Sequence, residues 1–330
     1  MSPTAPVLLI HGGEGDATVE LREHEAAFRE ALLGALEAGR RALEAGGGAI
    51  DVAQAAVAEM ESCELFNAGR GSALCSDGSV QMSAALMRGS DRAAGAVAGL
   101  SRTEHPILAA RYVLESEQVL FAGEWADRHA AALGAAQRDN AFFVTEHQRA
   151  RLLAVAGAEG RRTGAEVRGA VDEVRGTVDE VRGTVGDVRG TVGAVCLDSR
   201  GVLAAATSTG GRSGQPPGRV GDSPVIGAGT WADQHVAVSC TGAGEAFIRA
   251  GAAHQIAMLL KSGLTVAQAA ERSLADVAKL SRHGGLIAVD STGATATPLL
   301  SEVMPGGVWR AGVEPMAWVT DPPRRFGTPR

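Results

Sequence analysis

One threonine in this sequence, Thr191, stands where its hydroxyl could become a nucleophile. It opens an uninterrupted run of small and apolar residues, 191–197, directly after a polar and glycine-punctuated stretch at 160–189. A threonine hydroxyl is a weak nucleophile unless a base lies beside it, and the free α-amine of an N-terminal threonine can be that base. We therefore expect the chain to be cut between Gly190 and Thr191. Without a cut, the same residues describe an ordinary β-hairpin that follows a loop.

A second group of reactive side chains lies in the glycine-rich loop 218–224. Arg219 and Asp222 stand three positions apart in it, so the loop presents both signs of charge. A guanidinium pairs well with a carboxylate, and a carboxylate pairs well with an ammonium group. The loop therefore suits the two charged ends of an α-amino acid. A local ion pair at the surface is the alternative interpretation.

Two further stretches have the composition of binding sites. Thr241 and Gly242 follow an expected strand at 235–240 and precede a helix, so a hydroxyl and free backbone N–H groups can stabilise an oxyanion there. The alternative is a threonine helix cap with a glycine turn. The glycines of residues 63–72 permit positive φ, so the carbonyl oxygens of this loop can converge on a hard cation. A plain connecting loop explains the same glycines.

Strands and helices are expected on both sides of these loops. Apolar residues recur at helical spacing in 22–45, and a run of glycines follows. Asp51 is expected to cap the next helix, and Thr145 with Gln148 to form a capping box at the start of another. Short apolar runs bounded by turn residues predict strands at 7–11, 80–87, 93–100, 191–197, 202–207, 235–240 and 286–290.

Composition restricts the function of the chain. With 330 residues, 45% of them hydrophobic, it can bury a sizeable core. The net charge of −7, with no basic cluster, argues against nucleic acid or an anionic membrane as a partner. The four cysteines form no CxxC pair, which indicates reduced thiols. No apolar run approaches the ~20 residues that span a bilayer, and we expect a cytoplasmic protein.

Residues 166–190 repeat a seven-residue unit. Their valines have the spacing of a coiled-coil seam, but each unit also contains a glycine, which costs about 1 kcal/mol in a helix. We interpret the stretch as a low-complexity linker, with a marginal helix as the alternative. Thr177 and Thr184 share the Gly-Thr-Val context of Thr191, but only Thr191 opens an apolar strand.

A series of motifs, taken in order, resembles one known family. The motifs are His11-Gly12-Gly13, Leu65-Phe66-Asn67-Ala68-Gly69, and residues 190–195, 206–211, 218–224, 227–230 and 241–245. Together they resemble the plant-type L-asparaginase and isoaspartyl peptidase family of the N-terminal-nucleophile hydrolases, over nearly the whole chain. The repeat at 166–190 is not a feature of that family.

The resemblance implies a four-layer αββα sandwich, an α/β (α+β) fold that residues 1–330 form as a single unit. It also implies self-cleavage into an α subunit, 1–190, that ends in the linker at about 160–190, and a β subunit, 191–330. Thr191 would be the nucleophile and its own α-amine the general base. An α-amine has a pKa of about 8, so a useful fraction is neutral at pH 7.

Other positions receive roles from the same resemblance. Thr209 would hydrogen-bond the hydroxyl of Thr191, and Asn67 would position groups near it. Thr241 and Gly242 would form the oxyanion hole.

The substrate and a sodium ion would be bound by two further sets of residues. Arg219 and Asp222 would bind the α-carboxylate and α-amine of an aspartyl unit, with help from Gly244. A structural Na⁺ would be held by backbone carbonyls of Met60, Glu61, Cys63, Phe66, Ala68 and Arg70. No cofactor would take part in the chemistry.

The implied reaction is hydrolysis of the side-chain amide of L-asparagine and of the isopeptide bond of β-aspartyl dipeptides, with release of L-aspartate. The cleaved protomers would form a homodimer. A glycosylasparaginase-like amidase and an uncleaved, non-enzymatic binding protein are the alternatives. The chain departs from the family pattern at Ser83, where aspartate is usual, at Glu14, where a small residue is usual, and at His105, where asparagine is usual.

Overall fold

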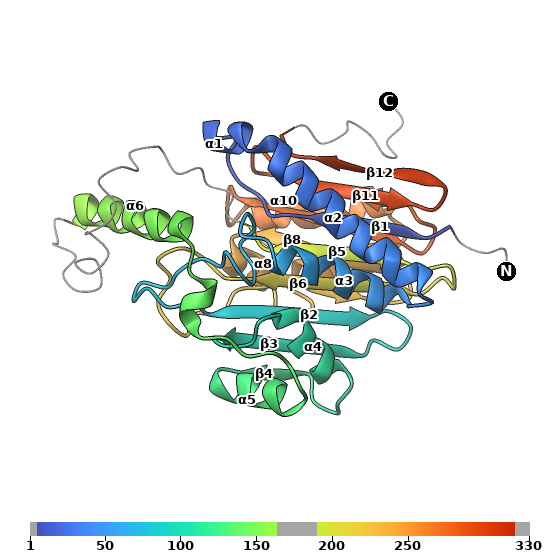
Figure 1. Cartoon of the computed structure of the whole chain (residues 1–330). Coiled ribbons are helices and arrows are strands. Elements are labelled where there is room, and N and C mark those ends of the chain that lie inside the picture. Colours follow the sequence, from blue (N-terminus) through green and yellow to red (C-terminus); the bar gives the residue numbers. More distant parts are fainter. Residues whose placement is uncertain (1–4, 164–189, 321–330) are drawn as a thin grey trace.

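The computed structural model describes residues 5–163 and 190–320, which form two β-sheets lying face to face between outer helices (Figure 1). Strands of one sheet contact strands of the other, and each sheet contacts its own helices on its remaining face. The expected αββα sandwich is therefore confirmed. The linker predicted at 160–190 begins inside a helix, because residues 160–163 belong to α6 (Glu146–Thr163). Residues 164–189, with Thr177 and Thr184, lie outside the described part.

The larger sheet has the strand order β12-β11-β1-β5-β6-β2-β3-β4. Its strands are β1 (Val7–His11), β2 (Met82–Arg88), β3 (Ala94–Leu100), β4 (Leu120–Ala122), β5 (Val192–Leu197), β6 (Leu203–Thr209), β11 (Gly306–Arg310) and β12 (Val313–Trp318). All neighbours are antiparallel except β3 and β4. Every residue of β1, β5 and β6 is buried, because these central strands are covered on both faces.

The smaller sheet has the strand order β10-β9-β8-β7. Its strands are β7 (Thr230–Ala232), β8 (Val236–Gly242), β9 (Gly284–Asp290) and β10 (Thr295–Ala296). An apolar layer fills the space between the two sheets and includes Leu9, Val195, Leu203, Ile287 and Val289. This layer fixes how β5 and β6 of the larger sheet face β8 and β9 of the smaller one.

Helices cover the outer face of each sheet. Against the larger sheet pack α2 (Glu25–Glu44), α3 (Ala49–Glu61) and α4 (Pro106–Leu114), and against the smaller sheet pack α8 (Gly244–Ala250), α9 (Ala252–Lys261) and α10 (Val266–Ala278). The remaining helices of the described residues are α1 (Val19–Glu23), α5 (Glu124–Ala132), α6 and the 3₁₀ turn η1 (Asn140–Phe143). The helix predicted at 22–45 is thus divided at His24. None of the described helices is long and apolar enough to cross a membrane.

The predicted caps were right in part. Gly48, and not Asp51, is the N-cap of α3; Asp51 stands three positions later and its carboxylate accepts the Gly48 N–H at 2.8 Å. Thr145 does accept the N–H of Gln148, at 3.3 Å. The Gln148 side chain, however, donates to the carbonyl of Gly71 at 2.8 Å, so the return bond of a capping box is replaced by a tertiary one.

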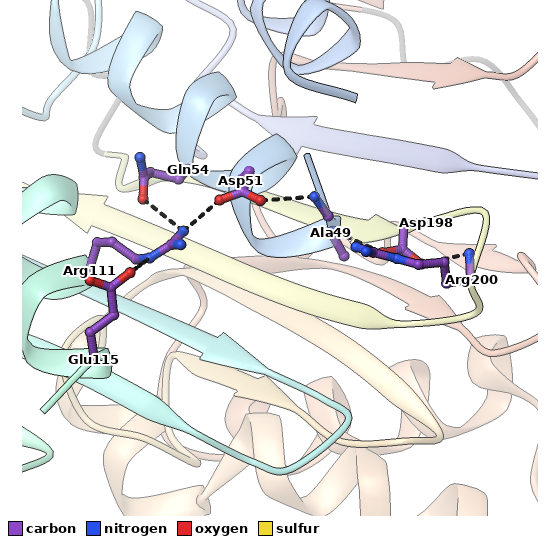
Figure 2. Close-up of polar contacts among 8 residues, drawn as sticks. Ala49, Asp51, Gln54, Arg111, Glu115, Asp198 and Arg200 are labelled. Carbon is purple, nitrogen blue, oxygen red and sulfur yellow. Dashed lines mark hydrogen bonds and ion pairs between the residues drawn. The ribbon is translucent and has the colours of Figure 1, made fainter. Parts of the chain in front are cut away.

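A polar cluster fixes the turn end of the β5–β6 hairpin (Figure 2). Asp198, in the turn, accepts the Ala49 N–H of α3 at 3.1 Å and pairs with Arg200 at 3.0 Å. Asp51 of the same helix pairs with Arg111 of α4 at 2.8 Å. These contacts join the hairpin turn to two outer helices, while the opposite end of the hairpin holds Thr191.

Candidate active site

Thr191 lies at the start of the central strand β5, next to a buried Gly190, in a chain that is continuous between the two residues. Its exposed fraction is 7%. The ladder between β5 and β6 pairs Val192 with Ser208, so one more step places Thr209 beside Thr191. The sequence prediction that these two threonines are neighbours therefore has a geometric basis in the register of the hairpin.

The turn after β1 packs directly against the expected cleavage site. Gly13 has φ of +107°, and a Cβ built on it would lie 2.4 Å from the Gly190 Cα. A Cβ on Gly190 would lie only 1.8 Å from the Gly13 Cα. Since no side chain fits on either side, both positions require glycine, and the glycine-rich turn serves a close backbone approach.

The hydroxyl of Thr191 has one hydrogen-bond partner among the described residues, the hydroxyl of Ser223 at 3.3 Å. The Thr209 hydroxyl instead accepts the N–H of Gly211 at 3.0 Å. In the uncleaved chain, the bond expected between Thr191 and Thr209 is therefore not among the hydrogen bonds of the described part. Ser223 lies in the motif at residues 218–224, but the sequence alone assigned it no role.

Asn67 ties its loop to the end of β6. Its Nδ2 donates to the Gly211 carbonyl at 2.7 Å, and its Oδ1 accepts the N–H of Ala73 at 2.7 Å. Its own carbonyl accepts the N–H of Gly210 at 3.0 Å. Asn67 therefore holds the Gly-Gly turn that follows Thr209, which agrees with a positioning role near the nucleophile.

Arg219, Asp222 and Gly244 converge on one point. A Cβ on Gly244 would lie 2.9 Å from the Arg219 Nη2 and 2.9 Å from the Asp222 Oδ1. The Arg219 guanidinium is held by Glu245 through Nε at 3.0 Å and by Gln215 through Nη1 at 3.2 Å. Within the described part of the chain, Arg219 forms its ion pair with Glu245 and not with Asp222, so the interpretation as a simple pair within the loop is not supported.

Two buried polar atoms in this region have no hydrogen-bond partner in the described part of the chain. They are the Oδ2 of Asp222, which is 3% exposed, and the Oγ1 of Thr241, which is fully buried. Burial raises the pKa of Asp222 to about 7, and the positive charge of Arg219 opposes that rise. A buried carboxylate without a partner is costly, so it suits a cationic ligand. Gly242, next to Thr241, has φ of +139° at the end of β8.

The loop after α3 has converging carbonyl oxygens. A Cβ on Gly69 would lie 2.3 Å from the Glu61 oxygen, and one on Gly71 would lie 2.6 Å from that of Glu64 and 2.7 Å from that of Phe66. The Glu61 carbonyl also accepts the Arg70 N–H at 2.8 Å. The carbonyl oxygens of Glu64 and Phe66 thus lie close together beside Gly71, whereas that of Glu61 lies beside Gly69.

Of the three departures from the family pattern, Ser83 and Glu14 are buried and His105 is half-buried. Ser83 pairs with Thr209 across the β2–β6 ladder, and its hydroxyl accepts the Gly99 N–H at 3.3 Å. Glu14 is 1% exposed and accepts a hydrogen bond from the hydroxyl of Ser301. The Nδ1 of His105 lies 3.3 Å from the carboxylate of Glu61.

Two face-to-face sheets between helices, and a buried threonine that opens a central strand, define the αββα class of N-terminal-nucleophile hydrolases. The family model described as Asparaginase matches residues 4–315, and the chain belongs to that family. A Salmonella typhimurium protein named isoaspartyl peptidase is 44% identical over 311 residues, covering 92% of this chain and 94% of that protein. A Homo sapiens protein named isoaspartyl peptidase/L-asparaginase is 34% identical over 310 residues, covering 93% and 94%.

Proposed function

We propose that this chain is a threonine hydrolase that cleaves itself between Gly190 and Thr191 and then hydrolyses L-asparagine and β-aspartyl dipeptides. The observation that carries the proposal is the unpartnered, buried carboxylate oxygen of Asp222 beside Arg219 and Gly244. An α-amino acid supplies the missing ammonium group for Asp222 and a carboxylate for Arg219. The names of the relatives support the same substrate class.

The first reaction is maturation. The Thr191 hydroxyl attacks the carbonyl carbon of Gly190, the C–N bond to Thr191 breaks, and the hydroxyl proton ends on the departing nitrogen. The products are an ester between Gly190 and the Thr191 oxygen, and a free α-amine. Water then hydrolyses the ester, which leaves the fragments 1–190 and 191–330.

Turnover uses the new amine. The α-amine of Thr191 takes the hydroxyl proton as the oxygen attacks the side-chain carbonyl of the substrate. We assign the developing oxyanion to the hydroxyl of Thr241 and the N–H of Gly242, since such donors stabilise charge best in a site closed to water. Ammonia or an amino acid leaves with the proton. Water then hydrolyses the β-aspartyl ester and releases L-aspartate.

The loop after α3 is proposed to hold a structural sodium ion. Its ligands would be the backbone carbonyls of Met60, Glu61, Cys63, Phe66, Ala68 and Arg70, and the packing around Gly69 and Gly71 adds that of Glu64. The ion would supply no chemistry. It would keep the loop, and with it Asn67, in place. The melting temperature should then be higher in NaCl than in choline chloride of equal ionic strength.

The homodimer and the cytoplasmic location remain predictions from the sequence.

A denaturing gel of the purified protein tests maturation. We expect two fragments, with the smaller one beginning at Thr191 and not at Thr184 or Thr177, as N-terminal sequencing will show. Thr191→Ala should give one uncleaved, inactive band. A single band in the unchanged protein that hydrolyses no β-aspartyl dipeptide would instead support the uncleaved binding protein.

Steady-state kinetics then define the substrate. Parallel measurements on L-asparagine, β-aspartyl-leucine and a glycosylated asparagine should give turnover on the first two. Preferential release of aspartate from the glycosylated substrate would favour the glycosylasparaginase alternative.

A further inference from the structure

A row of buried hydroxyls runs from His11 to the loop that contacts the nucleophile. The Nε2 of His11 lies 3.0 Å from the Oγ of Ser239, which lies 2.8 Å from the Oγ1 of Thr207. Thr207 lies 2.7 Å from the Oγ1 of Thr230, which donates to the Ser223 carbonyl at 2.9 Å. We call His11 and the three hydroxyl residues Ser239, Thr207 and Thr230 the hydroxyl row. It joins β1, β6, β7 and β8, and so bridges the two sheets.

The row ends on a backbone carbonyl. The Thr230 hydroxyl is placed to donate to the Ser223 carbonyl and to the Oγ1 of Thr207, so these two acceptors share its single proton. Between Thr207 and Ser239, and between Ser239 and the Nε2 of His11, either group can be the donor. Burial lowers the pKa of His11 to about 3, although a hydrogen bond with the backbone of Thr191 opposes that fall, so the ring is neutral.

The row is a costly feature for an apolar interface. The side chains of His11, Ser239, Thr207 and Thr230 are all fully buried, and Ser223 is 1% exposed. Buried polar groups destabilise a protein unless they are hydrogen-bonded, and a connected network fixes one arrangement of the elements that carry it. The arrangement fixed here includes the backbone of Ser223, whose side chain contacts Thr191 at 3.3 Å.

Before cleavage, the nucleophile lacks its usual base. The nitrogen of Thr191 belongs to the amide bond with Gly190 and has no basic lone pair, so the α-amine mechanism is closed to the first reaction. Yet the hydroxyl must present a lone pair to the Gly190 carbonyl. In the uncleaved chain its one described partner is Ser223.

We propose that Ser223 positions the Thr191 hydroxyl for self-cleavage and that the hydroxyl row holds Ser223 in register. Thr191 donates its proton to the Ser223 oxygen, which directs a lone pair toward the Gly190 carbonyl carbon. Ser223 stays neutral throughout, because the Thr191 proton ends on the departing Thr191 nitrogen. Once the α-amine is free, it replaces Ser223 as the main partner. The inference rests on the proposed self-cleavage and names a residue for it.

Cell-free synthesis tests this, because cleavage can be followed on gels from the moment the chain is made. We expect Ser223→Ala to slow cleavage by about tenfold or more, as loss of an orienting hydrogen bond does. The kcat per cleaved chain should fall by a clearly smaller factor, because the amine then acts. A defect of folding alone would lower the yield of folded protein without separating these two rates.

A pair of substitutions at Thr230 tests the row without touching the nucleophile's partner. Thr230→Val keeps the shape and removes the hydroxyl, whereas Thr230→Ser keeps the hydroxyl. Cleavage should slow in the first and stay close to the unchanged rate in the second. Ser273→Ala is the matched control, since Ser273 is equally buried and donates one hydrogen bond, to Ala252 at 2.9 Å, in another layer.

The outcomes separate this inference from the proposed function. If the unchanged protein is not cleaved at all, the proposed self-cleavage is wrong, and so is the inference that rests on it. If the unchanged protein is cleaved and Ser223→Ala is cleaved equally fast, only the role of Ser223 is overturned. Equal slowing by Thr230→Val, Thr230→Ser and Ser273→Ala would overturn the role of the row, because packing would then explain the effect.

Discussion

Gly13 and Gly190 lie in direct backbone contact, although 177 positions separate them in the sequence. Gly13 follows β1 and Gly190 precedes β5, and these strands pair antiparallel with His11 opposite Gly193. The register of this pair therefore brings the glycine turn onto the expected cleavage site. The contact limits how the Gly190 carbonyl can move. Attack by the Thr191 hydroxyl requires a defined angle to that carbonyl, so the contact favours the reaction.

We predict that Gly13→Ala slows self-cleavage by at least about tenfold, because the new methyl group must displace Gly190 from its position. The control is Gly312→Ala. Gly312 also has a positive φ, +79°, but a Cβ there meets nothing within 4 Å. Both variants place an alanine at a positive φ and so strain the backbone, but only Gly13→Ala also brings a methyl group against Gly190. Gel time courses of the two proteins measure the difference; equal cleavage would show that the contact is unimportant.

Activity should fall as the pH is lowered through about 7. Burial raises the pKa of Asp222 to about 7 from its usual 3.8, so the free site is increasingly protonated below neutral pH. Only the ionised form pairs with an α-ammonium group, and kcat/KM for L-asparagine should drop about tenfold per pH unit below that point.

Ligand binding isolates Asp222 from the Thr191 amine, which also protonates in acid. By calorimetry, L-aspartate should bind more weakly below pH 7, whereas succinate, which has no ammonium group, should not weaken in the same range. Parallel weakening of both ligands would count against Asp222 as the ammonium partner.

The guanidinium of Arg219 should matter for its geometry as well as its charge. Arg219→Lys keeps the charge but loses the planar donors that Glu245 and Gln215 orient, so KM for L-asparagine should rise by about 10- to 100-fold. Arg212→Lys is the matched control, since Arg212 approaches the same Glu245 only at 3.7 Å and is exposed. A similar change of KM in both variants would contradict the assigned role.

His105 should make stability depend on pH. Its Nδ1 lies 3.3 Å from the fully buried carboxylate of Glu61, which also accepts from the Ser208 hydroxyl at 2.6 Å and the Ile107 N–H at 3.0 Å. The Glu61 carboxylate holds the pKa of His105 above its usual 6.5. Burial raises the pKa of Glu61, although His105 opposes that rise. The histidine pairing therefore stabilises the fold fully below pH 6.5 and is lost as the pH rises through the raised value.

Thermal unfolding between pH 5 and 9 measures this dependence. We expect His105→Asn to lower stability by about 2 kcal/mol at pH 6, because the buried carboxylate of Glu61 then loses its cationic partner. The stability of the variant should also decline less than that of the unchanged protein as the pH rises above 7. His235→Asn is the control and should follow the unchanged protein, because the His235 ring lies 3.3 Å from the exposed Gln234 amide and next to no carboxylate in the described part of the chain.

A candidate nucleophile could be proposed from local sequence. Thr191 stands out because an uninterrupted apolar run begins there and because the chain before it has no such pattern, although an ordinary hairpin explains the same residues. Arg219 and Asp222 share one short loop, so their spacing alone indicated a zwitterion. The strands 7–11 and 93–100 were placed within one residue, because most of their residues are buried and their apolar runs are therefore continuous.

Contacts between distant segments were decided by the tertiary structure. The hydroxyl row joins four strands that pair in two different sheets, and no local pattern states which serine faces which threonine. The same holds for Gly13 against Gly190, whose approach depends on the pairing of β1 with β5. Sequence alone thus determined that Thr191 can be the nucleophile. The packing of the two sheets decided that Ser223 is the residue its hydroxyl contacts, because sheet register and interlayer packing act between segments far apart in the chain.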